Sequence, residues 1–365
     1  MLPRNLLQRT IVLPDMDDKH DQRDEVQALR QTAWRSWTLG GSAIALAGAA
    51  LFNRSRSKKA ERDRPPIGDF VEVDGVRLHY LDRGSGPPLV LLHGNGATIE
   101  DYLLSGLIDE AAAHYRVIAF DRPGFGYSER PRSTIWSPSA QAELIFKALM
   151  QLDVERPIVL GHSWGTLAAL AMALDHPEEI AALVLLAGYY FPTARPDAAL
   201  LSPPAIPVIG DILRYTVSPL AGRVMAPTMF ASMFSPDVVP ANIGQWPLDM
   251  ALRPSQIRAA AADTALMIPA ASELSERYGE LSLPIIIVGG VGDKIAHFSD
   301  QSAALHGTIA SSELVTVAGA GHMVHYTAPE RVMVAIDRAR TLGSGGANTR
   351  AEDDLVHPPG SSAIL

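Results

Sequence analysis

The sequence contains no cysteine, and this absence removes a whole set of chemistries. Without thiols the chain has no disulfides, no thiolate nucleophile and no cysteine-ligated metal site, while the redox compartment stays undecided. The chain also has no excess of positive charge, because it contains 31 Lys and Arg residues and 40 Asp and Glu residues. This acidic balance argues against nucleic acid as a partner. The 365 residues, 47% of them hydrophobic, suffice for one large α/β domain with an insertion, or for two ordinary domains.

Charge is also missing from one stretch near the N-terminus, SWTLGGSAIALAGAALFN at residues 36–53. As a helix it would span about 27 Å at ~1.5 Å per residue, close to the roughly 30 Å of bilayer hydrocarbon. Small residues four apart, Gly41, Ala45 and Ala49, suit close packing of membrane helices. The basic run that follows favours a cytoplasmic C-terminal side. We therefore expect a single-pass membrane anchor with the main domain in the cytoplasm.

A run made mostly of Ala and Gly is only weakly apolar, so an amphipathic or flexible tether on a cytoplasmic protein is the alternative. A cleavable signal peptide fits less well, because some 35 mostly polar residues precede the run. Membrane association through residues 36–53 is thus an expectation for the structure to test.

The middle of the chain alternates between strand-like and helix-like segments. Two alternating runs within residues 70–81 meet at Asp74-Gly75 and predict a β-hairpin. Short continuous apolar runs then recur, as is typical of strands buried on both faces of a parallel sheet. These runs are residues 88–92, 117–120, 158–160, 182–186, 285–288 and 314–317. Helical patterns fall between most of them, so we predict a mostly parallel α/β sheet with flanking helices.

Residues 189–282 break this rhythm, since they are rich in Pro, Met and Ala and contain no clear buried strand. We interpret them as a mainly helical cap over the carboxyl ends of the strands, where ligands of open α/β sheets bind. The alternative is a small second domain with no part in the site. The predicted organisation is a charged N-terminal segment (1–35), a transmembrane helix (36–53), a basic linker (54–67), a core (68–188 and 283–341), the cap (189–282) and a disordered tail (342–365).

The stretch GHSWG, Gly161 to Gly165, places a serine where a strand meets a helix. Glycine on both sides permits a tight strand-to-helix turn that pushes the hydroxyl of Ser163 outward. The N-terminus of the helix also favours negative charge developing there. This G-x-S-x-G pattern in a strand–turn–helix context predicts that Ser163 is a nucleophile.

A serine nucleophile needs a base, and the base needs an orienting acid. His322 follows the last apolar run and a Gly-rich turn, which places it at the same sheet edge as Ser163. His325 is its rival, and otherwise a packing residue. Asp293 follows the preceding apolar run and is the expected acid. The chain order Ser163, Asp293, His322 is the one that accompanies this type of elbow.

The tetrahedral intermediate of acyl transfer needs hydrogen-bond donors for its oxyanion. We expect one donor to be the backbone N–H of Trp164, directly after the nucleophile. The second is expected from Asn95, in the H-G-N-G loop that follows the apolar run 88–92. His93 is expected to brace this loop. The set needs no metal and no organic cofactor.

With these motifs placed, residues 68–341 resemble the α/β-hydrolase superfamily. FDRPGFGYSERP at 120–131 is similar to the family's D-R-x-G-x-G-x-S loop, in which Asp121 would be structural, and GAGHMVHYTAPERV resembles its terminal histidine loop. The resemblance implies an α/β-hydrolase fold, a helical cap that shapes the pocket, and cofactor-free cleavage of a small apolar acyl substrate.

Asn95 and Trp164 also resemble the pair of residues that holds the halide in haloalkane dehalogenases. Haloalkane dehalogenases and epoxide hydrolases carry Asp as the nucleophile at the elbow. Here the elbow residue is Ser163, and a serine that attacked an alkyl halide would be left as a stable ether. The resemblance therefore implies an esterase. A carbon–carbon bond or lactone hydrolase, a cofactor-free perhydrolase and a non-catalytic binding protein of this fold stay open.

Overall fold

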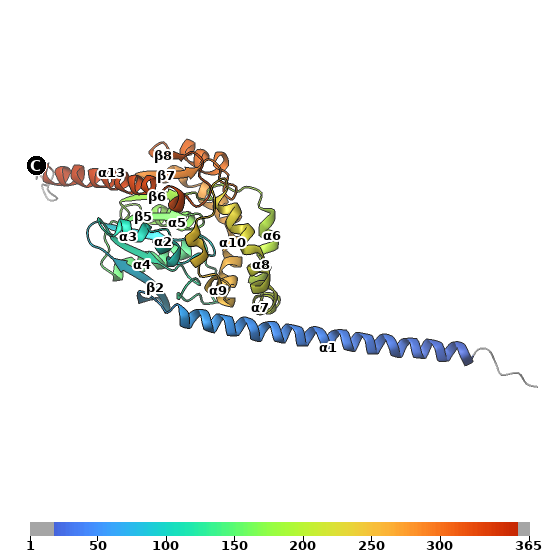
Figure 1. Ribbon diagram of the computed structural model, residues 1–365. Helices are drawn as coiled ribbons and strands as arrows, with labels where there is room; N and C mark the ends of the chain where they lie inside the picture. Colours follow the sequence, from blue (N-terminus) through green and yellow to red (C-terminus); the bar gives the residue numbers. More distant parts are fainter. Residues whose placement is uncertain (1–17, 357–365) are drawn as a thin grey trace, which may run out of the picture. The chain divides into compact units, whose positions relative to one another are not determined.

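A computed structural model describes the backbone of residues 18–356 and the side chains of Gln27 and residues 42–345. The chain divides into two compact units, Met1–Leu51 and Phe52–Leu365. In the first unit the described residues form the beginning of one helix, α1 (Asp18–Asp63), and every residue of the predicted site belongs to the second (Figure 1). The parts of the predicted N-terminal segment and tail at residues 1–17 and 357–365 lie outside the described residues.

Eight strands form one sheet in the order β1-β2-β4-β3-β5-β6-β7-β8. The first two pair antiparallel around Asp74-Gly75, as the hairpin pattern predicted, and β2 is also antiparallel to β4. The neighbours from β4 onward run parallel. The mostly parallel α/β fold is therefore confirmed. The strands are β1 (Asp69–Val73), β2 (Val76–Arg83), β3 (Pro88–Leu92), β4 (Arg116–Phe120), β5 (Ile158–His162), β6 (Ala182–Leu186), β7 (Ile285–Gly290) and β8 (Ser312–Val317).

Helices cover both faces of this sheet, because successive side chains of each strand point to opposite sides. In β3, Leu89 and Leu91 share one buried cluster with α2, α3 and α13, whereas Val90 and Leu92 share another with α4 and α5. The flanking helices are α2 (Ile99–Leu104), α3 (Leu107–Ala111), α4 (Pro138–Gln151), α5 (Gly165–Asp175), the π-helical turn η4 (Ser299–Ala303), α11 (Ala304–Thr308), α12 (Val324–Thr327) and α13 (Pro329–Val356).

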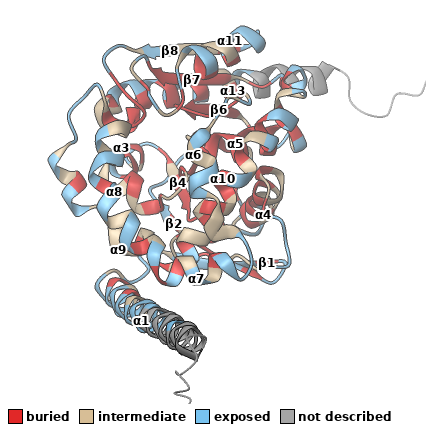
Figure 2. Ribbon diagram, turned by 90° about the vertical axis from the view of Figure 1, so that its right-hand side faces the viewer, coloured by how far each residue is buried: buried red, intermediate tan, exposed pale blue. Residues whose placement is uncertain are grey.

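The segment between β6 and β7 is mainly helical, and Figure 2 shows α6, α7, α8 and α10 together on one side of the domain. Its two long helices reach the carboxyl-end loops of the sheet: the amide of His322 donates to Met233 O of α8 at 2.9 Å, and Asn95 contacts α10. Its elements are α6 (Pro196–Leu201), η1 (Pro203–Ala205), α7 (Ile209–Tyr215), α8 (Val217–Phe234), η2 (Ala241–Gln245), α9 (Leu248–Ala251), α10 (Pro254–Ser275) and η3 (Tyr278–Glu280).

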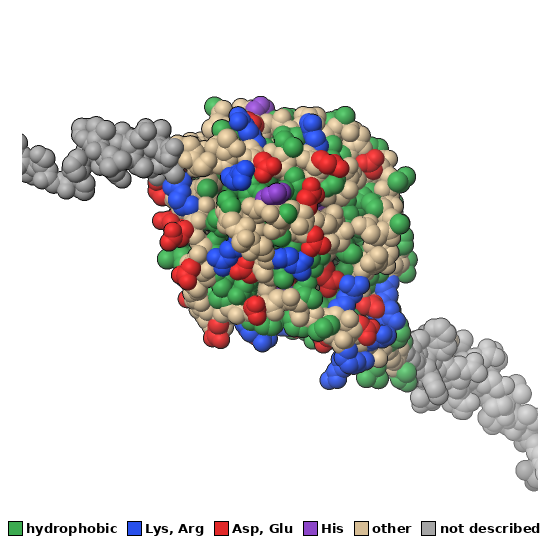
Figure 3. Space-filling view, turned by 60° about the vertical axis from the view of Figure 1, so that its left-hand side comes forward, with side chains coloured by type: hydrophobic (Ala, Val, Ile, Leu, Met, Phe, Trp, Pro, Cys, Tyr) green, Lys and Arg blue, Asp and Glu red, His purple; other side chains and the backbone are tan. Residues whose placement is uncertain are grey.

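The last turns of α1, from Phe52 to Asp63, belong to the second unit and contact the cap. The side-chain amide of Asn53 donates to the carbonyl of Thr216 at 2.9 Å, and Glu61 pairs with Arg253 at 3.0 Å. Residues 54–63 of the predicted linker are helical as the end of α1, and Glu61 among them has its partner on the cap. Figure 3 shows Lys and Arg side chains gathered in this region.

The predicted membrane anchor is wrong. Residues 36–53 are helical as part of α1, but no helix in the described part of the chain is sufficiently long and apolar to cross a membrane. The physical reason lies in the composition of the run, since Ala and Gly carry little apolar surface to bury in hydrocarbon. The single-pass topology, and the localisation inferred from it, lose their basis.

The C-terminal segment also differs from its prediction. We expected disorder from residue 342, whereas α13 continues as a helix to Val356. No proline interrupts the sequence between Pro329 and Pro358, so the backbone donors needed to extend the helix are all present.

Candidate active site

Ser163 lies at a sharp turn between β5 and α5. Its φ of +53° is in the left-handed region, an unusual conformation for a residue with a side chain. The flanking glycines make the turn possible. A Cβ on Gly165 would lie 2.1 Å from the carbonyl oxygen of Leu92, and one on Gly161 would lie 2.7 Å from the backbone of Gly165. The elbow therefore needs glycine at both positions and holds the serine in a strained conformation.

The structure brings Ser163, His322 and Asp293 together. The Nε2 atom of His322 lies 2.9 Å from the Oγ of Ser163, and its Nδ1 lies 2.8 Å from Oδ2 of Asp293. The three side chains come from the loops after β5, β8 and β7, whose carboxyl ends meet at one edge of the parallel sheet. An ionised carboxylate can only accept, so Nδ1 carries the proton and Nε2 is free to take the proton of the serine.

Asp293 and His322 are held by further hydrogen bonds. The Oδ1 atom of Asp293 accepts the amides of Ile295 and Ala296 at 2.7 and 2.9 Å, which leaves Oδ2 for the imidazole. Both side chains are almost completely buried, whereas Ser163 is partly exposed. The acid and the base are thus fixed in place, and the nucleophile is the member of the three open to a substrate.

His325, the rival base, belongs to a different pair. Its Nε2 lies 3.2 Å from Oδ2 of Asp101, and the hydroxyl of Tyr326 donates to Oδ1 of the same carboxylate at 2.9 Å. Its ring packs on His162 at 4.5 Å between centroids. The structure therefore gives His325 a packing and hydrogen-bonding role behind the nucleophile, and His322 contacts the serine.

Asp101, His162 and His325 also form a cluster of metal-ligand types, with one ligand atom from each within 4.8 Å of the others. Tetrahedral zinc holds nitrogen and oxygen ligands at about 2.0–2.1 Å, which requires ligand atoms roughly 3.4 Å apart. Both oxygens of Asp101 already accept hydrogen bonds from protein groups. The geometry fits a hydrogen-bonded cluster better than a metal site.

Asn95 and Trp164 flank the serine, but their side chains point into contacts with α10. The amide Nδ2 of Asn95 donates to Ala260 O at 3.1 Å and to Thr264 Oγ1 at 2.9 Å, and the indole N–H of Trp164 donates to Asp263 O at 3.0 Å. Neither side-chain donor is therefore free to hold a halide.

The backbone N–H groups of Asn95 and Trp164 have a different environment. Neither donates to a backbone carbonyl in the described part of the chain. Two amides from the loops after β3 and β5 are the usual composition of an oxyanion hole in this type of elbow. The oxyanion role of these two amides stays a prediction.

His93 braces the same loop, as expected from the sequence. Its Nδ1 donates to the carbonyl of Gly94 at 2.8 Å, and its Nε2 accepts the amide of Arg122 at 2.9 Å. Complete burial, reinforced by the Arg122 guanidinium, lowers the pKa of His93 to about 4. The imidazole is therefore neutral at physiological pH and serves as a structural link.

The lowered pKa of His93 makes stability depend on pH. Below the ordinary histidine pKa of about 6.5, His93 is protonated in the unfolded chain but stays neutral in the folded chain. The free energy of unfolding therefore decreases as the pH falls from 6.5 towards 4. We expect His93 to contribute a loss of about 2 kcal/mol between pH 7 and pH 5. Urea denaturation at the two pH values measures this loss. His93→Gln should reduce the difference, whereas His114→Gln, at an exposed position, should leave it unchanged.

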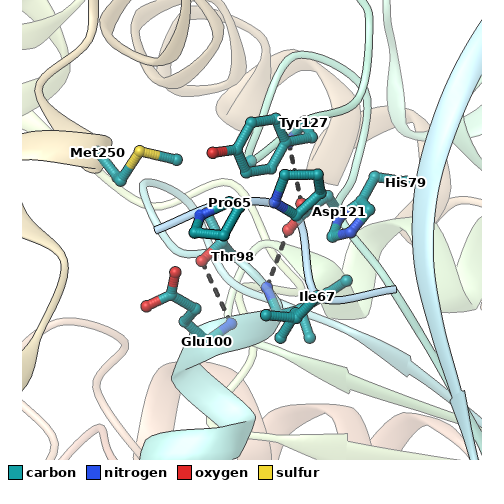
Figure 4. A pocket seen from close by; sticks show the side chains of 11 residues that line it. Pro65, Ile67, His79, Thr98, Glu100, Asp121, Tyr127 and Met250 are labelled. Carbon is teal, nitrogen blue, oxygen red and sulfur yellow. Dashed lines mark hydrogen bonds and ion pairs between the residues drawn. The ribbon is translucent and has the colours of Figure 1, made fainter. Parts of the chain in front are cut away.

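Figure 4 shows a pocket away from the catalytic side chains, between the end of α1, the loop after β4 and the start of α2. Its polar side chains are those of His79, Thr98, Glu100, Asp121 and Tyr127, and Ile67 and Met250 contribute apolar surface. None of its lining residues belongs to the set Ser163–His322–Asp293. That set is the candidate active site, because there a serine hydroxyl, an imidazole and a carboxylate are in direct hydrogen-bond contact.

The sequence motifs do not identify two charged residues beside the site, Arg122 and Asp263. Both side chains are completely buried and pair at 2.8 Å. Asp263 is the single acid in the Ala-rich run IRAAAADTALM, a signal that could have marked it as a buried partner for a distant cation.

Comparison with known proteins agrees with this fold. The family model described as alpha/beta hydrolase fold matches residues 87–228. Haloalkane dehalogenase 2 of Mycobacterium tuberculosis (strain ATCC 25618 / H37Rv) is 28% identical over 268 residues, which cover 71% of this chain and 90% of that protein. The solved enol-lactonase from Burkholderia xenovorans LB400 superimposes with a TM-score of 0.61 at 18% identity, covering 75% of this chain and 100% of that one.

A third relative is the 2-hydroxymuconate semialdehyde hydrolase of Pseudomonas sp. (strain CF600), 37% identical over 136 residues that cover 36% of this chain. The chain spans about half the length of that relative, 48%. Together with the elbow and the sheet topology, these matches show the α/β-hydrolase fold. The chain is similar to proteins of that superfamily that are named as hydrolases.

Proposed function

We propose that this protein is a serine hydrolase that cleaves an ester through an acyl-enzyme. The observation that supports the proposal is the continuous contact from Ser163 Oγ through His322 to Asp293, at 2.9 and 2.8 Å, on a nucleophile elbow. Serine is a poor nucleophile unless an adjacent base removes its proton, and this arrangement provides such a base.

In the first half-reaction the Oγ of Ser163 attacks the ester carbonyl carbon as its proton moves to Nε2 of His322. The π electrons of the carbonyl move onto its oxygen, which accepts hydrogen bonds from the amides of Asn95 and Trp164. As the intermediate collapses, the C–O bond to the alcohol breaks and His322 returns the proton to the leaving oxygen. The acyl group remains on Ser163, while Asp293 stabilises the imidazolium.

In the second half-reaction water attacks the acyl-enzyme and gives its proton to His322. The same two amides hold the second oxyanion, and the imidazolium protonates Ser163 as the acid product leaves. The cycle consumes one water and one ester and releases one alcohol and one acid. Protons move between the substrate, water, Ser163 and His322.

A small apolar acyl compound is the substrate class that we propose. The cap exposes many large apolar side chains, among them Leu200, Val208 and Val224, each more than two-thirds exposed. Exposed apolar side chains on the cap favour contact with apolar molecules. Haloalkanes are a poor alternative, because the elbow residue is Ser163 and the side-chain donors of Asn95 and Trp164 are occupied.

A carbon–carbon bond hydrolase on the same residues is the second candidate. It is favoured by the name of the Pseudomonas relative, a 2-hydroxymuconate semialdehyde hydrolase that is 37% identical over its matched part. Turnover of aryl and alkyl esters compared with a ring-opened dienone separates the two candidates.

The test of the proposed function is labelling of the full-length protein with a fluorescent fluorophosphonate. We expect one adduct per chain, located on Ser163 by mass spectrometry, because an activated serine displaces fluoride from phosphorus. Circular dichroism shows whether the protein is folded. A folded protein that takes up no label would contradict the proposal and favour a non-catalytic binding role. A label elsewhere would contradict the assignment of Ser163.

A further inference from the structure

Both proposed oxyanion donors are tethered to one turn of the cap helix α10. Asn95, from the loop after β3, reaches Ala260 O and Thr264 Oγ1, while Trp164, from the loop after β5, reaches Asp263 O. The two loops follow different strands of the sheet, yet both are fixed to residues 260–264 of α10, a helix of the cap. The distance between the two amides therefore depends on where α10 lies.

Arg122 connects this turn of α10 to the backbone of the oxyanion loop. Its guanidinium donates to Oδ2 of Asp263 at 2.8 Å, while its Nε and second terminal nitrogen donate to the carbonyls of His93 and Gly94 at 2.7 and 3.1 Å. The guanidinium also lies over the ring of Trp164, 4.3 Å from its centroid. One side chain thus contacts both loops of the proposed oxyanion hole.

Asp263 is the charged partner that holds Arg122 in this position, and Oε1 of Gln141 accepts from the same terminal nitrogen at 2.8 Å. The Asp263 carboxylate accepts from Arg122 and Arg130 at 2.8 Å each and from the side-chain amide of Gln141 at 3.2 Å. Asp263 and Arg122 are completely buried, so the guanidinium has no access to solvent as a replacement partner. Without the carboxylate the buried Arg122 would be drawn to other acceptors, and the turn at His93 and Gly94 would move with it.

We propose that Asp263 is a positioning residue of the oxyanion hole, acting through Arg122 and the turn His93–Gly94 to aim the amide of Asn95. The inference rests on the proposed function, because it presumes an oxyanion at that amide. The cap therefore does more than cover the site: one of its helices sets the geometry in which the transition state is stabilised. Oxyanion donors act only when they are aimed at the developing charge, so a displacement reduces kcat and leaves ground-state binding nearly unchanged.

The experiment compares full-length wild type with Asp263→Asn, using fluorophosphonate titration to count working sites. For each titrated site we expect kcat for an aryl ester to fall about 10- to 100-fold with KM within twofold. A boronic acid, whose tetrahedral adduct on Ser163 mimics the oxyanion, should bind at least about tenfold more weakly. The alcohol product, which carries no oxyanion, should inhibit as in wild type.

Arg130→Gln is the matched control. It removes the other ion pair of Asp263, but Arg130 contacts Pro123 O and neither loop of the oxyanion hole. We expect Arg130→Gln to have a lower melting temperature than wild type. Its affinity for the boronic acid and its kcat per titrated site should both lie within twofold of the wild-type values. Equal shifts in Asp263→Asn and Arg130→Gln would show a merely structural role and overturn the inference.

Thr264→Val covers the case in which Asp263→Asn does not fold. It removes one acceptor of the Asn95 amide and leaves the charged network intact. We expect boronate affinity to fall a few-fold, again with unchanged inhibition by the alcohol, and no change would overturn the inference. A wild type that neither titrates nor hydrolyses esters overturns the proposed function itself, whereas a reactive wild type with unshifted variants overturns the positioning role alone.

Discussion

Ser163→Ala is expected to lower kcat for ester hydrolysis by about 10⁵-fold or more, leaving only the rate that oriented binding and the oxyanion donors provide. The physical reason is the loss of the atom that forms the acyl-enzyme, since the hydroxyl contacts His322 at 2.9 Å. The φ of +53° at position 163 costs alanine about as much conformational free energy as it costs serine. The melting temperature should therefore stay close to that of wild type. Stopped-flow or discontinuous assays on an aryl ester, with thermal denaturation alongside, measure both quantities.

Ser137→Ala is a matched control for this loss. Ser137 caps the N-terminus of α4 by accepting the amide of Ala140 at 3.2 Å. Removing such a cap costs about 1 kcal/mol of stability, so this variant should be less stable with kcat unchanged. The two serines thus give opposite patterns, and residual turnover of Ser163→Ala within tenfold of wild type would contradict the proposed mechanism.

Asp293→Asn is expected to lower kcat by about 10⁴-fold, the loss typical of a triad whose acid can no longer fix the imidazole tautomer. The Oδ1 atom of Asp293 accepts two amides, which would hold the asparagine with its NH₂ facing Nδ1 of His322. The imidazole would then carry its proton on Nε2 and could not accept that of Ser163. Measurement of kcat/KM against pH should show this loss across the neutral range.

The second buried Asp–His pair supplies the control for Asp293→Asn. Asp101→Asn makes the same chemical change beside His325, which the structure separates from Ser163. We expect lower stability, because a buried pair loses its charge, but kcat per folded molecule within a few-fold of wild type. If Asp101→Asn abolishes turnover and Asp293→Asn does not, His325 is the base and our assignment is reversed.

Much of the fold could be predicted from local patterns. Runs such as 88–92 and 182–186 are continuously apolar because both faces of a parallel strand are buried, and each became a strand. The elbow could be predicted for a similar reason, because the need for glycine at positions 161 and 165 is local. A Cβ added at either position would clash with the backbone. Where composition was equivocal, as in the Ala- and Gly-rich residues 36–53, the predicted membrane span was wrong.

The sequence by itself determined the α/β architecture and the candidates Ser163, Asp293 and His322, because these follow from strand ends that must meet at one sheet edge. Only the tertiary structure decided between His322 and His325, since the two lie three residues apart and their roles depend on partners more than 150 residues away. It alone revealed the pairing of Arg122 with Asp263, 141 residues apart in sequence. Hydrogen bonds between distant side chains depend on how the cap packs on the core, and no local pattern encodes that packing.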